Sequence, residues 1–194
     1  MANKTQCSEI ISRVGSFYIL FPPLIWNFTM CNCRLTHMKL YISTESRAIS
    51  KYILRKGRSD LLRESNLSES AMVDVWLEVE KAHFNSAMSP IILQSFVVPN
   101  FLGGETDVKI VMENLEKLKT ALEVYEARLS RFKYLAGDFV SLADISHFPA
   151  AYYLLGGPHA SVLEAYPHVK AWIAEVKERP SVKKVAELMK MPSA

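Results

Sequence analysis

The sequence predicts a mainly α-helical protein, and three observations lead to that prediction. From residue 44 onward, apolar residues recur at steps of three and four, which is the spacing of one helix face. Capping residues, prolines and glycines stand where such helices would begin and end. Apart from residues 39–42, no stretch alternates apolar and polar residues as a half-buried strand does. We therefore expect an all-helical array over most of the chain.

The composition is that of an ordinary globular protein. With 194 residues, 49% of them hydrophobic, the chain can bury one core, or one core and a small satellite domain. The net charge of +3 comes from scattered residues, so no nucleic-acid partner is expected. The three cysteines lie within the first 33 residues, which argues for a reducing compartment. Cys31 and Cys33 with His37 lack a second ligand pair, so no metal site is expected.

Residues 1–43 form an atypical hydrophobic N-terminal segment. The apolar run at 14–30 is interrupted by Pro22 and Pro23, which would break a membrane-spanning helix. No small-residue cleavage site follows the run, so we expect neither a secretory signal nor a membrane span.

A short amphipathic helix is predicted between Ser43 and Gly57. Ser43 or Thr44 can cap it, and Glu45 lies in the first turn, where a negative charge suits the helix dipole. The charged residues 56–66 that follow contain Gly and Ser and are the best candidate for a domain boundary.

Two longer helices should follow. The first is expected to be capped by Ser68 and bent at Pro90. Gly103 then turns the chain, and Thr106 or Asp107 starts the second helix. The second helix carries a one-sided apolar seam: Val111, Leu115, Leu118, Leu122, Tyr125 and Leu129.

The clearest helix start lies at Ser141. Asp144 can accept the backbone N–H of Ser141, which makes the pair a capping box. The helix that follows is apolar on nearly every side, as a buried central helix is. A helical turn at 161–165 and helices started by Pro167 and by Pro180 with Ser181 complete the chain.

Six segments together point to a known family. They are ESRAI at 45–49, MVDVW at 72–76, ENLEKL at 113–118, YLAGD at 134–138, SLAD at 141–144 and YPHVKAW at 166–172. On these segments, residues 45–194 resemble the cytosolic glutathione transferases, and within them the plant phi class. The resemblance implies a thioredoxin-like glutathione-binding domain, with a remnant at 44–58, followed by the family's C-terminal helical bundle at 67–194.

The resemblance also implies function. It predicts a cytoplasmic transferase that conjugates glutathione, its co-substrate, to hydrophobic electrophiles and needs no other cofactor. The expected assembly is a homodimer, or a heterodimer with related subunits.

Four residues match binding positions of the family. Glu45 and Ser46 match the acidic-serine pair that holds the γ-glutamyl end of glutathione, a role that suits a carboxylate and hydroxyl at a helix start. From the residues alone, both could simply cap the helix. Leu93 and Val97 match positions that line the electrophile pocket. Three neighbours could join that pocket or belong to the core: Ile92, Phe96 and Leu155.

The family's catalytic serine motif and cis-proline are not found before Glu45, so no catalytic residue is assigned. Three interpretations follow. The chain is a glutathione transferase of weak or absent activity, or a non-enzymatic helical module that binds ligands or dimerises. Alternatively, residues 1–43 come from an alternative transcript or start of a complete enzyme.

Overall fold

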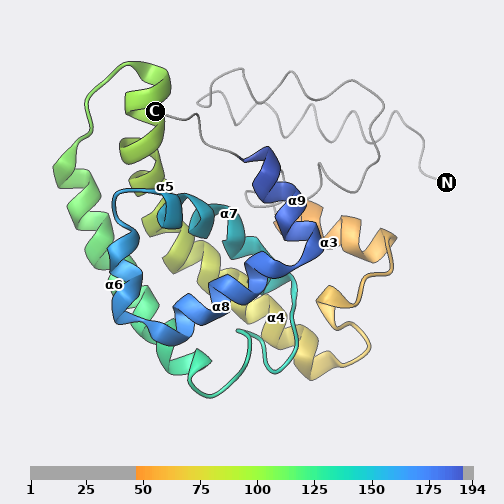
Figure 1. Cartoon of the computed structure of the whole chain (residues 1–194). Helices are drawn as coiled ribbons and strands as arrows, with labels where there is room; N and C mark the ends of the chain where they lie inside the picture. The colour runs from red at the N-terminus through yellow and green to blue at the C-terminus, as the bar shows by residue number, and fades with distance from the viewer. Residues whose placement is uncertain (1–46, 190–194) are drawn as a thin grey trace, which may run out of the picture. The chain divides into compact units, whose positions relative to one another are not determined.

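The structure is a computed structural model that describes residues 47–189, all within one compact unit. These residues form helices joined by short loops and contain no strand, which confirms the predicted helical class (Figure 1). The longer helices are α3 (Arg47–Lys56), α4 (Leu67–Val79), α5 (Ser86–Ile92), α6 (Val108–Leu129), α7 (Leu142–Gly156), α8 (Pro167–Glu178) and α9 (Pro180–Leu188). Four tighter or wider helical segments are η4 (Asp60–Leu62), η5 (Glu80–Asn85), η6 (Leu93–Leu102) and η7 (Ala160–Ala165).

Helix α7 is the central element of the core, as its sequence predicted. Ten of its fifteen residues are buried, and it packs against α4, α5 and α8 (Figure 1). A helix apolar on all sides gains stability only when neighbours cover it completely, and these three helices do so. Asp144 accepts the Ser141 backbone N–H at 2.8 Å, so the predicted capping box is present.

The chain from α4 to η6 is helical throughout, but its backbone hydrogen-bond register changes twice. Segments η5 and η6 are π-helical, with wider turns than α5 between them. The Ser86 hydroxyl donates to the carbonyl groups of Ala82 and His83, which lie in the first wide turn. Pro90 lies inside α5. The expected single bent helix is therefore a helix with two wide-turn segments.

Helix starts agree with the sequence in part. Asp107 caps α6 by accepting the N–H groups of its first turn, one of the two predicted possibilities. The prediction that Ser68 caps α4 is wrong, because the Asn66 side chain accepts the N–H groups of Ser68 and Glu69. Pro180 is the first residue of α9, so Ser181 lies inside that helix and not at its cap. No helix within residues 47–189 is long and apolar enough to cross a bilayer.

Candidate functional site

The predicted binding residues fall on two parts of the chain. Glu45 and Ser46 lie outside the described residues, as does the possible strand at 39–42; the described chain begins with Arg47, the first residue of α3. Leu93 and Val97 lie one turn apart on η6.

The start of α3 is anchored by a buried ion pair between Arg47 and Glu80. The Arg47 side chain is 9% exposed and that of Glu80, in η5, is 3% exposed. A buried charge is costly unless an opposite charge accompanies it, so this pair fixes α3 against the wide turn of η5. Lys51 makes a second, more exposed bridge to Asp74 on α4, with 2.8 Å between Nζ and Oδ1.

Sequence reasoning did not identify this ion pair, although a signal was present. Glu80 stands four residues after Trp76 and four before Phe84, on the same stripe of the helix. A carboxylate on an apolar stripe requires a buried cation or a ligand. Arg47, directly after the predicted glutathione-binding pair, supplies the cation.

The surface of η6 is apolar and partly exposed. Leu93 is 38% exposed and Leu155, at the end of α7, is 36% exposed, whereas Val97 is half-buried. The Phe96 ring packs on Tyr153, with 5.0 Å between centroids, and Ile92 packs against the core. Leu93 and Leu155 are thus available to a ligand, while Ile92 serves the core.

Polar contacts hold η6 to the segments beside it. The side-chain carbonyl of Gln94 accepts the N–H of Asp107 at 3.0 Å, and its backbone carbonyl accepts the Thr106 hydroxyl at 2.9 Å. Ser95 Oγ lies 3.4 Å from His159 Nε2. These contacts fix the position of η6 relative to α6 and to the turn after α7.

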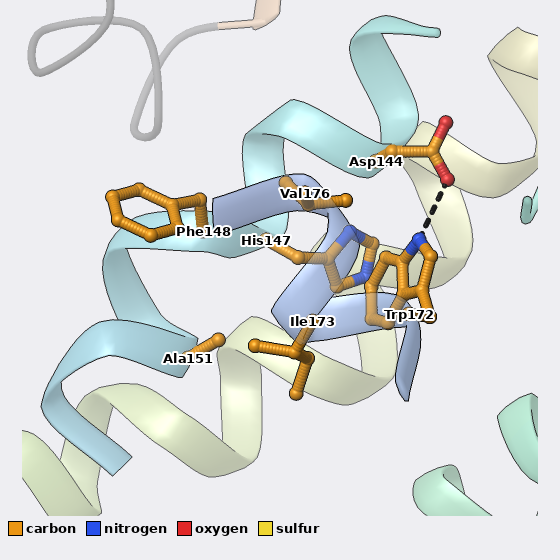
Figure 2. Close-up of a pocket in the computed structure, with 7 residues that line it drawn as sticks. All are labelled: Asp144, His147, Phe148, Ala151, Trp172, Ile173 and Val176. Carbon is orange, nitrogen blue, oxygen red and sulfur yellow. Dashed lines mark hydrogen bonds between the residues drawn. The ribbon is translucent and has the colours of Figure 1, made fainter. Parts of the chain in front are cut away.

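A small cavity lies between α7 and α8 (Figure 2). Its volume is about 10 Å³, which is room for about one water molecule and far below the size of any substrate pocket. The lining residues are Asp144, His147, Phe148, Ala151, Trp172, Ile173 and Val176. This cavity is a packing gap and not a binding site.

The Asp144 carboxylate beside that cavity joins three parts of the core. It accepts the N–H of Leu135 at 3.0 Å, the N–H and hydroxyl of Ser141 at 2.8 Å each, and the indole N–H of Trp172 at 3.0 Å (Figure 2). Burial raises the pKa of Asp144, and these donors oppose that rise without cancelling it. With all four donors directed at it, the carboxylate is structural.

His147 is also structural. Its Nδ1 lies 2.6 Å from the Ala143 carbonyl, which can only accept, so Nδ1 carries the proton. The Tyr125 hydroxyl therefore donates to Nε2, 2.9 Å away. Burial lowers the pKa of His147 to about 3 and raises that of Tyr125. Neither group exchanges protons at neutral pH, so neither suits acid–base catalysis.

Within residues 47–189, no group of three or more His, Cys, Asp or Glu side chains is placed to hold a metal ion. The described surface offers hydrophobic contact through η6 and a fixed cation at the start of α3.

Comparison with known proteins gives a consistent result. Residues 81–180 match the family model of the glutathione S-transferase C-terminal domain. Glutathione S-transferase 1 of Zea mays is 50% identical over 207 residues, which cover 99% of this chain and 94% of that protein. A solved glutathione S-transferase-I bound to lactoylglutathione has a TM-score of 0.72 and 60% identity, covering 74% of this chain and 68% of that one. Glutathione S-transferase I from mais, in complex with an atrazine glutathione conjugate, has a TM-score of 0.72 and 61% identity, covering 77% and 69% of the two chains.

Proposed function

This chain belongs to the glutathione S-transferase family, within the plant phi class, and from that membership we propose that it conjugates glutathione to hydrophobic electrophiles. Glutathione is the co-substrate of this class. The observation that carries the proposal is the buried Arg47–Glu80 pair, which fixes the helix directly after Glu45 and Ser46. The two similar solved proteins hold glutathione derivatives, one of them carrying the aromatic herbicide atrazine.

Each proposed binding residue has a chemical role. Glu45 pairs with the ammonium of the γ-glutamyl group, and the Ser46 hydroxyl donates to its carboxylate near the N-terminus of α3. Arg47 adds positive potential at the same place. Leu93 and Val97 contact the electrophile, where apolar contact removes its surface from water. The glutathione sulfur then forms a bond to the electrophilic carbon, and the leaving group departs with the bonding electrons.

We further propose that conjugation is slow compared with binding. No serine motif that would stabilise the glutathione thiolate is recognised in the sequence, and at neutral pH most of an unactivated thiol stays protonated. The protein would then bind glutathione and its conjugates while it turns them over weakly.

The remaining organisation follows the family. We propose residues 1–43 as an atypical N-terminal segment, 44–58 as a remnant of the thioredoxin-like domain and 67–194 as the helical domain. We also propose a cytoplasmic protein that forms a homodimer or pairs with related subunits. Sedimentation analysis of the purified chain tests the dimer, since a monomer at micromolar concentration contradicts it.

Calorimetric titration with glutathione tests the binding site. Ser46→Ala should weaken binding about tenfold through the loss of a hydrogen bond to a charged group. Ser130→Ala is the matched control, because the Ser130 hydroxyl contacts only the Ala127 carbonyl among the described residues. Equal affinities in wild type and Ser46→Ala would remove this assignment. Absorbance assays with a chlorinated dinitrobenzene then measure conjugation.

A further inference from the structure

Two arginines in the linker between α3 and α4 have left-handed backbone conformations. Arg58 has φ 51° and Arg63 has φ 52°, a region that residues other than glycine adopt rarely and at a cost. A conformation of this kind persists where surrounding contacts hold it. For Arg63 the structure contains such contacts.

The Arg63 side chain connects the linker to two other parts of the molecule. Its guanidinium pairs with Asp60 and with Glu69 on α4, the Nε–Oε2 distance to Glu69 being 2.6 Å. The guanidinium carbon lies 4.7 Å from the ring centroid of Phe139, in the loop before α7. Gly137 leaves room for that ring, since a Cβ there would lie 2.9 Å from it. We name these four side chains, Arg63, Asp60, Glu69 and Phe139, the linker clasp.

The position of α3 depends on this linker. A ten-residue helix is marginal in isolation, and α3 buries only Ser50 completely. Its last turn is instead held by an ion pair between Arg55 and Glu64, with 2.6 Å between Nε and Oε1. Glu64 follows Arg63 directly, and Leu62, just before it, is buried in the core. Contacts that fix Arg63 therefore also fix the end of α3.

We infer that Arg63 is a positioning residue for glutathione, acting through the linker clasp on the helix that begins after Glu45 and Ser46. The inference rests on the proposed function, because it takes those two residues as the glutathione site. With the clasp formed, α3 keeps one position on the helical bundle. Without it, only a fraction of molecules holds the binding arrangement, and the apparent Kd rises in inverse proportion to that fraction.

Two glycine variants separate the clasp from backbone strain. Glycine adopts positive φ freely, so Arg63→Gly and Arg58→Gly relieve the same strain, but only the first removes the clasp. Arg58 is the matched control, because its side chain forms no ion pair within residues 47–189.

Calorimetry on the full chain should show the glutathione Kd raised about tenfold in Arg63→Gly, since each lost contact is worth a factor of about two to five. Arg58→Gly should stay within about twofold of wild type. In turnover assays, KM for glutathione should rise while kcat at saturating glutathione stays constant. General destabilisation would lower the active fraction at constant KM. A wild-type Kd in Arg63→Gly, or a loss of kcat at unchanged KM, overturns the inference.

Hydrogen exchange distinguishes this failure from a failure of the proposed function. If the wild-type chain binds no glutathione, the site assignment at Glu45 and Ser46 is wrong. The clasp is then judged on the amides of α3. Their exchange should be about tenfold faster in Arg63→Gly than in wild type, from the same lost contacts. Equal rates in the two proteins overturn the positioning role whether or not glutathione binds.

Discussion

Replacing Asp144 should destabilise the protein more than any other single carboxylate change in the central helix. In Asp144→Ala, the backbone N–H groups of Leu135 and Ser141 and the indole N–H of Trp172 lose their acceptor in the core. A buried donor left unsatisfied costs about 1–3 kcal/mol. Three such donors would cost up to about 9 kcal/mol if nothing relaxed. The desolvation of the carboxylate, which raises its pKa, offsets part of this loss. We expect a net loss of about 3–5 kcal/mol, the range found when one partner of a buried charged network is removed.

The pH dependence gives a second, independent readout. The pKa of Asp144 is raised in the folded state above its ordinary value of 3.8. Its contribution is therefore fully present below the unfolded pKa and is lost as pH rises through the folded pKa. Asp144→Asn cannot titrate, so the stability gap between wild type and this variant should widen as pH falls from 7 toward 4. Effects of other carboxylates occur in both proteins and cancel in the difference.

Urea unfolding followed by far-UV circular dichroism measures both quantities. Asp138→Asn is the control, because its carboxylate lies in an exposed loop and accepts one N–H, from Lys133 at 3.1 Å. The control should lose less than about 1 kcal/mol. The reasoning is refuted if Asp144→Ala also loses less than about 1 kcal/mol, or if the gap for Asp144→Asn narrows toward acid pH.

Three further changes test separate contacts by the same urea assay. Glu126→Gln should lose about 1 kcal/mol at pH 7, because this carboxylate caps α8, and its lowered pKa means that the loss disappears as pH falls below the folded pKa; a gap that persists at pH 2 contradicts this. Glu80→Gln should lose about 3 kcal/mol, because Arg47 stays buried without its carboxylate, and a loss near zero would mean that the pair does not anchor α3. Gly137→Ala should lose about 1–3 kcal/mol, because the new methyl group would displace the Phe139 ring; an unchanged midpoint would show that the loop adapts freely.

Local chemistry allowed much of the fold to be predicted from the sequence. Ser141 with Asp144 identified the start of α7, because a capping residue, an acid three positions later and an apolar run agree on one boundary. The start of α4 was placed two residues late, because Asn66 and Ser68 are both good caps and only tertiary packing selects between them. The wide turns η5 and η6 were not predicted, since side-chain periodicity does not reveal which carbonyl each N–H selects.

The candidate site was predicted less completely. Leu93 was correctly placed on an accessible helical segment, but spacing alone could not separate it from Ile92, which packs in the core. The pairing of Arg47 with Glu80 spans 33 residues of sequence, and no local rule joins positions that far apart. The contact between Arg63 and Phe139 is similarly remote along the chain.

The π-helical turn η5 also determines where the later apolar residues point. A wide turn holds about one residue more than an α-helical turn of 3.6 residues. Deleting one residue within Glu80–Asn85 would restore regular α-helical winding and rotate everything downstream by about 100° around the axis. Leu93 would then move to a different side of the helix. A single surplus residue, many positions earlier in the chain, thus sets the direction in which η6 presents its hydrophobic surface.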